Sequence, residues 1–222
     1  MITTLLWDFD GTLVDTNEVI LESWQITYEH YYGHRVSKEQ ITKCFGEPLL
    51  VTMAREFPGV DPAESAEVYR SYQRESAYKL VREFPGVFDL IKAFREMGLK
   101  QCIVTSRTRE SSTKYLEIFD MMDAFDGVVT CDDTDKHKPD PEPILLGLEK
   151  MHCSKDEALM IGDGVFDVKC ANNAGVKSVL VGWRITEGGS QVIPDAVHDY
   201  EADTTEDLLD LVKKLSTKQN NA

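Results

Sequence analysis

The residues near the start of the chain best suited to chemistry are two aspartates, Asp8 and Asp10, followed at once by Gly11 and Thr12. They come directly after residues 2–7, a short apolar segment that predicts a β-strand. Side chains two residues apart in extended backbone point to the same side, so the two carboxylates would lie close together. A hard divalent cation such as Mg²⁺ would relieve their repulsion. The alternative is a solvated acidic turn, because Asp and Gly are common in turns.

Three further groups suited to binding phosphate or metal follow later predicted strands. Thr105 and Ser106 carry hydroxyls that can bond a phosphoryl oxygen, as can the N–H groups that open the next helix. Lys138, which precedes a proline in a loop, can neutralise a carboxylate and a phosphate oxygen. Asp163 follows a strand and Asp167 lies four residues later. These two acids could complete the oxygen shell of a Mg²⁺ shared with the first aspartate.

Each of these groups also has an ordinary structural explanation. Ser and Thr cap helices, Asp is favoured in a first helical turn, and most lysines are surface residues. The groups nevertheless occur in the order Asp-x-Asp-Gly-Thr, Thr-Ser, Lys-Pro and Gly-Asp-x-x-x-Asp, each at the carboxyl end of a separate predicted strand. Ligands bind at that edge of an open α/β sheet. The joint pattern therefore predicts a site for phosphoryl transfer.

The segments between these groups predict an α/β fold with a helical insertion. From residue 84 onward, helical and strand patterns alternate, which predicts a doubly wound, Rossmann-like parallel sheet. Expected strands are 2–7, 99–105, 127–130, 158–161 and 177–181, and expected helices are 87–96, 111–119, 143–150, 165–174 and 205–215. Residues 16–81 have helical spacing interrupted by Gly and Pro. We expect a core domain of residues 1–14 and 84–222 and an inserted helical domain of residues 15–83.

Composition excludes some classes of partner. The formal net charge of −15 over 222 residues disfavours nucleic acid and anionic membrane surfaces, which require clustered Lys and Arg. We see neither a bilayer-spanning apolar stretch nor a signal-like N-terminus. The five cysteines are widely spaced and form no C-x-x-C pair, so we expect reduced thiols in a cytoplasmic protein. The acid-rich stretch 195–210 is most simply a solvated surface.

The ordered set of motifs resembles that of the haloacid dehalogenase (HAD) superfamily of phosphohydrolases, over essentially the whole chain. Four motifs carry the resemblance: Asp8-Phe9-Asp10-Gly11-Thr12-Leu13-Val14-Asp15, then Thr105, then Lys138, then Asp163 with Asp167. The helical insertion resembles the mobile cap domain of the helical-bundle type found in that superfamily. The implied fold is thus an α/β core with an inserted helical-bundle cap.

Within the superfamily, the chain resembles the phosphoglycolate phosphatase-like group and is most similar to its bacterial pyrophosphatase branch. The segments behind this similarity include Phe45-Gly46-Glu47-Pro48-Leu49, Val104-Thr105-Ser106-Arg107 and Lys138-Pro139-Asp140-Pro141-Glu142-Pro143. Arg107 departs from the branch, which often has Lys there, and Gly164-Val165-Phe166 stands where polar residues are more usual. These departures leave the chemistry intact but loosen the assignment of substrate.

The resemblance implies a Mg²⁺-dependent phosphohydrolase that forms an aspartyl-phosphate. In that scheme the nucleophile is Asp8 and the proton carrier is Asp10. The expected metal ligands are Asp8, Asp10 through its backbone carbonyl, and Asp163, with Asp167 orienting a metal-bound water. The expected phosphoryl and substrate contacts are Gly11, Thr12, Glu47, Thr105, Ser106, Arg107 and Lys138.

The first expectation for the substrate is inorganic pyrophosphate, and for the assembly a monomer or homodimer. One alternative is 2-phosphoglycolate or another phosphomonoester, and a second is phosphotransfer of the β-phosphoglucomutase kind, which uses the same core and cap. An alternative of another class is a receiver-type signalling domain, which also uses Mg²⁺, Asp, Thr or Ser, and Lys. A receiver lacks a cap and needs a long-lived phospho-aspartate, whereas Asp10 is placed to hydrolyse one.

Overall fold

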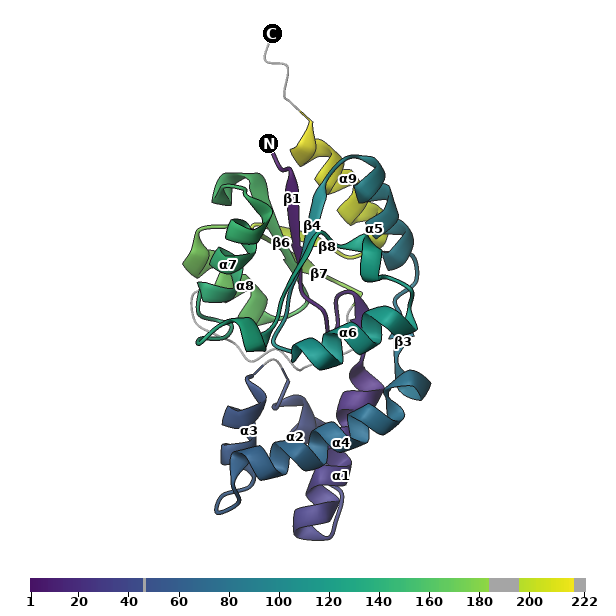
Figure 1. Cartoon of the computed structure of the whole chain (residues 1–222), viewed down its shortest axis with the longest axis vertical. Coiled ribbons are helices and arrows are strands. Elements are labelled where there is room, and N and C mark those ends of the chain that lie inside the picture. The colour runs from purple at the N-terminus through teal and green to yellow at the C-terminus, as the bar shows by residue number, and fades with distance from the viewer. Residues whose placement is uncertain (46, 184–195, 218–222) are drawn as a thin grey trace.

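The computed structural model describes residues 1–45, 47–183 and 196–217. Its centre is a six-stranded parallel sheet in the order β5-β4-β1-β6-β7-β8 (Figure 1). The strands are β1 (Thr4–Trp7), β4 (Lys100–Val104), β5 (Gly127–Val129), β6 (Ala158–Gly162), β7 (Lys177–Val181) and β8 (Tyr200–Ala202). The predicted doubly wound α/β fold is confirmed.

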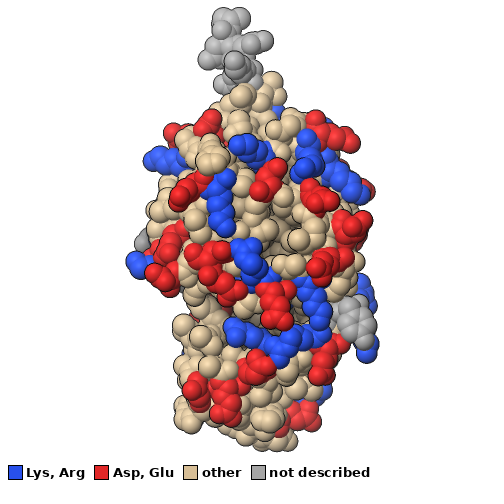
Figure 2. Space-filling view, viewed as in Figure 1, with Lys and Arg blue, Asp and Glu red and all other residues tan. Residues whose placement is uncertain are grey.

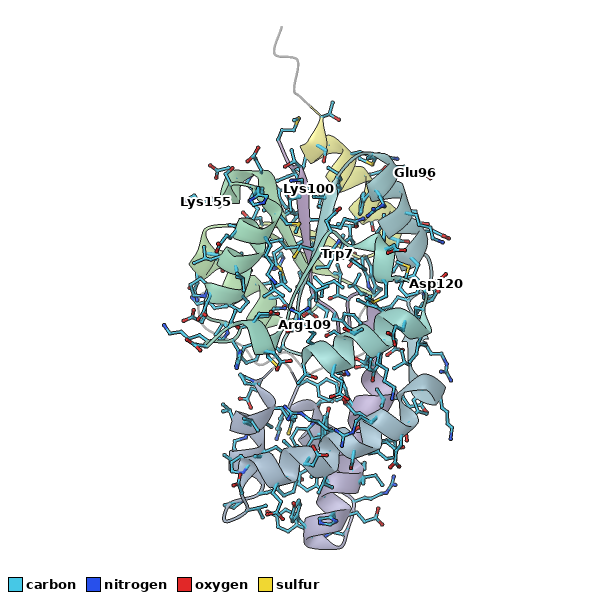
Figure 3. The ribbon with its side chains drawn as sticks, viewed as in Figure 1. Trp7, Glu96, Lys100, Arg109, Asp120 and Lys155 are labelled. Atoms are coloured by element: carbon cyan, nitrogen blue, oxygen red, sulfur yellow. The ribbon has the colours of Figure 1, made fainter. Side chains whose placement is uncertain are left out.

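Helices cover both faces of this sheet. They are α5 (Val87–Glu96), α6 (Arg109–Ile118), α7 (Glu142–Met151), α8 (Val165–Ala174) and α9 (Thr205–Ser216). Because strand side chains alternate between faces, Leu5 and Trp7 of β1 pack with residues of α5, α6 and α9, whereas Leu6 packs with α7 and α8. Figure 3 shows Trp7 in the interior and Glu96 and Lys155 at the rim. Burial on both faces fixes the register and therefore where each strand ends.

Among the described residues, the four helices that follow β1 and precede α5 form a separate layer, which we call the helical insert. They are α1 (Asn17–Tyr32), α2 (Lys38–Thr42), α3 (Leu49–Glu56) and α4 (Pro62–Leu80). Their apolar side chains form a cluster of their own around Trp24, Tyr28 and Phe57. The insert lies at the carboxyl ends of the strands, and the N-terminus and the end of α9 lie at the opposite end of the core (Figure 1). The division into two domains at residues 14 and 84 stays a prediction.

A two-stranded antiparallel ribbon joins the insert to the core. Strand β2 (Val14–Asp15) pairs with β3 (Arg82–Glu83), so the chain enters and leaves the insert side by side. The Asp15 carboxylate accepts the backbone N–H of Asn17 at 3.1 Å and starts α1. Asp15 therefore has a structural part at the entrance to the insert.

Two features differ from the sequence-based expectation. The ribbon was not predicted, because two-residue strands carry no periodic signal. Strand β8 lies within the acid-rich stretch expected to be only a solvated surface, where it buries Ala202 beside β7. Residue Asp195 of that stretch lies outside the described residues. In the part of the chain that the structure describes, every helix is too short or too polar to cross a membrane.

Candidate active site

The first loop carries Asp8 to the carboxyl edge of the sheet. The N–H of Asp8 donates to the Ile161 carbonyl at 2.8 Å, which extends the pairing of β1 with β6. Gly11 has φ +79°, and a Cβ at this position would collide with the Asp163 carboxylate. Glycine meets both requirements, the left-handed backbone and the close approach. It therefore lets the loop pass directly against the acid that follows β6.

A buried lysine connects two of the predicted acids. The Lys138 ammonium lies 2.7 Å from Oδ1 of Asp8 and 2.6 Å from Oδ1 of Asp167, and its side chain is 3% exposed. The peptide bond from Lys138 to Pro139 is cis. A buried charge of this kind persists only when it is paired. The loop before α7 is thereby tied to the end of β1 and the first turn of α8.

Three carboxylates form an acidic cluster around this lysine. One oxygen of each of Asp8, Asp163 and Asp167 lies within 4.8 Å of the others. Asp163 precedes α8, and Asp167 in its first turn accepts the Gly164 N–H at 3.1 Å. One ammonium among three carboxylates leaves an excess of negative charge. This donor set fits a hard divalent cation bound through oxygen.

The electrostatics of the cluster follow from burial. Burial raises the pKa of Asp8 to about 7, the charge of Asp167 raises it as well, and Lys138 opposes both. For Lys138, burial favours the neutral amine, but the charges of Asp167 and Asp8 outweigh it and raise the pKa above its ordinary value. The Lys138 ammonium therefore stays charged, and the raised pKa of Asp8 favours the protonated form of that carboxyl group.

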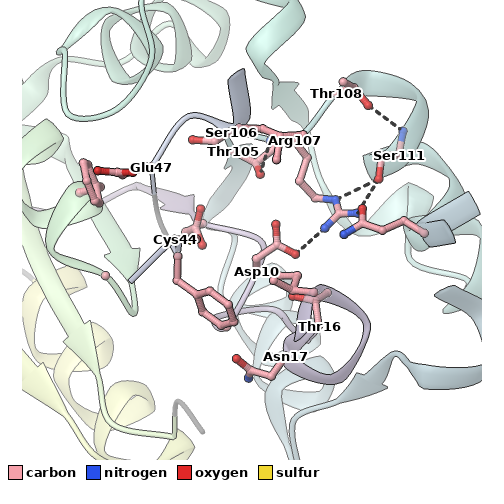
Figure 4. A pocket seen from close by; sticks show the side chains of 18 of the residues that line it. Asp10, Thr16, Asn17, Cys44, Glu47, Thr105, Ser106, Arg107, Thr108 and Ser111 are labelled. Atoms are coloured by element: carbon pink, nitrogen blue, oxygen red, sulfur yellow. Dashed lines mark hydrogen bonds and ion pairs between the residues drawn. The ribbon is translucent and has the colours of Figure 1, made fainter. Parts of the chain in front are cut away.

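The Asp10 carboxylate is not part of the acidic cluster and points toward Arg107 (Figure 4). Nη1 of Arg107 lies 2.6 Å from Oδ1 of Asp10, while Nε and Nη2 donate to Oγ of Ser111 at 3.1 and 2.5 Å. The guanidinium also lies 4.3 Å from the centre of the Tyr115 ring. Nη2 donates to Oε1 of Gln73 on α4 at 3.3 Å. Any contribution of Asp10 to a metal would thus come from its backbone carbonyl.

Arg107 lines the cavity, but its side chain is only 7% exposed and its N–H groups are directed to Asp10, Ser111 and Gln73. Its expected contact with a substrate stays a prediction. Sequence reasoning did not single out Gln73. Its only signal is its place on a largely polar helix, 34 residues from the arginine it contacts.

The remaining predicted residues lie around the same edge of the sheet. Thr105 follows β4, and its Oγ1 accepts the N–H of Arg107 at 3.2 Å. Ser106 and Gly11 line the cavity above the site. Thr12 is fully buried and is not among the residues that line the cavity, and its contact with a substrate stays a prediction.

A cavity of about 640 Å³ separates this edge from the helical insert. Such a volume is typical of sites for small metabolites. Glu47 lines its wall on the insert side, where it pairs with Arg55 and accepts the Thr52 hydroxyl at 3.1 Å. Its role toward a substrate stays a prediction, and its neighbour Gly46 lies outside the described residues.

The profile of the haloacid dehalogenase-like hydrolases matches residues 5–181. The chain belongs to this family. It is 36% identical to pyrophosphatase PpaX of Halalkalibacterium halodurans over 214 residues, which cover 95% of this chain and 97% of the relative. It is 35% identical to pyrophosphatase PpaX of Bacillus velezensis, with 94% and 95% covered. A solved structure of a candidate phosphoglycolate phosphatase from Lactobacillus plantarum is 27% identical, with a TM-score of 0.79 and 95% and 99% covered.

Membership of the HAD family confirms the resemblance drawn from the four motifs. The protein is a hydrolase, as the sequence predicted. The receiver-type alternative is set aside, because the family match runs through the helical insert to the end of β7. The fold brings the four sequence motifs together at the carboxyl edge of the central sheet.

The raised pKa of Asp8 yields a prediction about stability without metal. The folded state holds this proton more tightly than the unfolded chain, so stability falls as pH rises from 3.8 toward about 7. Asp8→Asn removes the buried charge. In EDTA we expect its Tm to exceed that of the wild type by several degrees at about pH 8, with the difference shrinking below about pH 7 and closing as the pH falls to 3.8. Scanning calorimetry across pH measures it; a variant Tm below the wild type at every pH contradicts the assignment.

Proposed function

We propose that this HAD hydrolase transfers a phosphoryl group from a small phosphate compound, inorganic pyrophosphate first, to Asp8 and then to water. The observation that carries the proposal is the Lys138 ammonium held between Asp8 and Asp167 on the cavity floor, with Asp163 beside them. An ionised carboxylate can attack phosphorus without a helper base, and the ammonium offsets the incoming negative charge. The relatives named pyrophosphatase support the choice of substrate.

In the first step, an oxygen of Asp8 attacks phosphorus in line, and the bond from phosphorus to the leaving oxygen breaks. Lys138 holds Oδ1 of Asp8, so we assign the attack to Oδ2. Arg107 holds Oδ1 of Asp10. We therefore propose that Oδ2 of Asp10 carries a proton and donates it to the leaving oxygen. Since Thr105 Oγ1 already accepts an N–H, its own hydroxyl proton is available for a phosphoryl oxygen.

In the second step, water attacks the phosphorus of the aspartyl-phosphate. Asp10 takes a proton from this water, the bond between phosphorus and the Asp8 oxygen breaks, and both carboxylates return to their starting states. One pyrophosphate and one water thus give two orthophosphates. Little charge builds up on the protein, so catalysis rests on positioning and fixed charges.

We further propose that Mg²⁺ is the resident metal. Asp8, Asp163 and the backbone carbonyl of Asp10 would hold it, and Asp167 would orient its water, in agreement with the clustered oxygens. When bound, the ion would neutralise charge on the carboxylates and on the phosphoryl oxygens.

We also propose that residues 15–83 act as a cap domain that closes over the substrate and excludes bulk water. The contact of Gln73 with Arg107 supports this role, because it connects the insert to the group that holds Asp10. A cytoplasmic location is part of the proposal as well, since the five free cysteines would stay reduced there.

A second candidate is a phosphomonoesterase, with 2-phosphoglycolate as one substrate. The cavity of about 640 Å³ is large for pyrophosphate. Its insert side also carries apolar side chains suited to an organic leaving group, namely Ile20, Trp24, Phe45 and Leu49. Transfer to a sugar phosphate, as in a mutase, would give a phosphorylated product instead of free phosphate.

Substitution of the two acids tests the mechanism. We expect Asp8→Asn to lower kcat at least ~10³-fold and Asp10→Asn to lower it ~10²- to 10⁴-fold, measured as phosphate release. Asp15→Asn is the matched control, because Asn can still accept the Asn17 N–H and residue 15 lies outside the cavity. Turnover of Asp8→Asn near that of the control rules out the nucleophile.

Chelation tests the metal. Excess EDTA should abolish phosphate release, and Mg²⁺ should restore it. Mg²⁺ alone should also raise the Tm of the wild type, because it binds the folded acidic cluster but not the unfolded chain. Full activity in excess EDTA would remove the metal from the mechanism.

A panel of substrates tests the leaving group. With pyrophosphate, 2-phosphoglycolate, sugar phosphates and nucleotides at equal concentration, we expect the highest kcat/KM for pyrophosphate. A higher value for an organic phosphate favours the second candidate. Phosphate retained on a sugar, seen by product analysis, favours the mutase.

A further inference from the structure

The cations of the cavity are not all used by the proposed mechanism. Among the described residues, five Lys and Arg side chains line it: Arg70, Arg74, Arg107, Lys114 and Lys138. Three of these are paired with carboxylates, Lys138 and Arg107 in the site and Arg74 with Glu67 on the insert. Within the described part of the chain, Arg70 and Lys114 have no carboxylate at ion-pair distance. Among the described residues, Arg70 and Lys114 are therefore the two cavity cations that stand outside these ion pairs.

These two cations come from opposite walls of the cavity. Arg70 is a half-buried residue of α4 in the insert, and Lys114 is a half-buried residue of α6 in the core. The Lys114 ammonium reaches the insert and donates to the Arg74 carbonyl at 2.6 Å. Arg70 and Arg74 lie four residues apart and share one face of α4. Figure 2 shows Lys and Arg side chains gathered where the insert meets the core.

The reach of Arg70 extends to the core. Burial raises the pKa of the Cys131 thiol to about 11, and the Arg70 charge opposes this rise. Cys131 follows β5, and its N–H donates to the Arg107 carbonyl at 3.0 Å. Arg70 also lines the same cavity as Thr105 and Arg107.

We propose that Arg70, assisted by Lys114, forms a second anion subsite that binds a negatively charged group on the leaving side of the substrate. The inference rests on the proposed function, in which Lys138 and Thr105 take the transferred phosphoryl group. A half-buried guanidinium without a carboxylate at ion-pair distance loses hydration, and an anionic ligand restores the lost interactions. The Lys114 ammonium uses one donor for the Arg74 carbonyl and has further donors for an anion. A guanidinium suits a phosphate or a carboxylate, since its donors match two oxygens at once.

The subsite defines a substrate class, small phosphates with a second anionic group. The distal phosphate of pyrophosphate and the carboxylate of 2-phosphoglycolate share this chemistry. Because Arg70 lies on the insert and Lys114 on the core, the second anion would contact both walls. Binding energy from this non-reacting end would then favour such substrates over plain monoesters.

The test compares Arg70→Gln with the wild type on pyrophosphate, 2-phosphoglycolate and p-nitrophenyl phosphate, which has no second anion. Loss of charged hydrogen bonds should lower kcat/KM for the doubly anionic substrates about 10- to 100-fold, with p-nitrophenyl phosphate within about twofold. A loss confined to pyrophosphate assigns the subsite to a phosphate, and one confined to 2-phosphoglycolate assigns it to a carboxylate. Arg70→Lys should recover part of the loss. Equal losses on all three substrates, or none, overturn the subsite.

Arg35→Gln is the matched control. Arg35 is also an arginine of the insert, it lies outside the cavity between Glu22 and Glu29, and its replacement changes net charge equally. We expect its kcat/KM within about twofold of the wild type on every substrate. A wild type that turns over p-nitrophenyl phosphate best overturns the subsite but not the chemistry. A wild type that releases no phosphate from any substrate overturns the proposed function, and the subsite with it.

Discussion

The arrangement of the site depends on one interaction, the Lys138 ammonium held between Asp8 and Asp167. Two carboxylates cannot be buried side by side without a cation, and an ammonium cannot be buried without carboxylates. The pairing therefore fixes three segments at once, the end of β1, the loop before α7 and the first turn of α8. Asp163 lies beside this pairing, and the three carboxylates together suit a divalent ion.

Much of this could be predicted from the sequence, because each group directly follows a strand. The bounds of α5, α8 and β7 agree with their patterns, and β1 lies between β4 and β6. Once strands are parallel, their carboxyl ends share one edge, so Asp8, Thr105 and Asp163 must be neighbours whatever the loops do. The positions of the motifs after predicted strands were therefore sufficient to predict that they lie close together in space, because neighbouring parallel strands end at the same edge of the sheet.

What the sequence could not supply depends on side-chain packing and on short pairings. The β2–β3 ribbon is too short for a periodic signal, and β8 is hidden in an acidic stretch. Arg107 could only be assigned to substrate, because its contacts with Asp10 and Gln73 arise from loop geometry and from a helix in the insert. Its packing on the Tyr115 ring is likewise invisible in residue spacing.

The core and the insert contribute different groups to the cavity. The acidic cluster and Lys138 belong wholly to the core, so the chemistry of phosphoryl transfer does not depend on the insert for its charges. The positioning of Asp10 does depend on the insert, because Gln73 of the insert contacts the arginine that holds it. The side of the cavity that carries Arg70 is also formed by the insert. On the proposed mechanism, separating the layers would loosen the proton carrier and remove one wall of the leaving-group site together. Selectivity and protonation would then respond to the same movement, while the nucleophile stays in place.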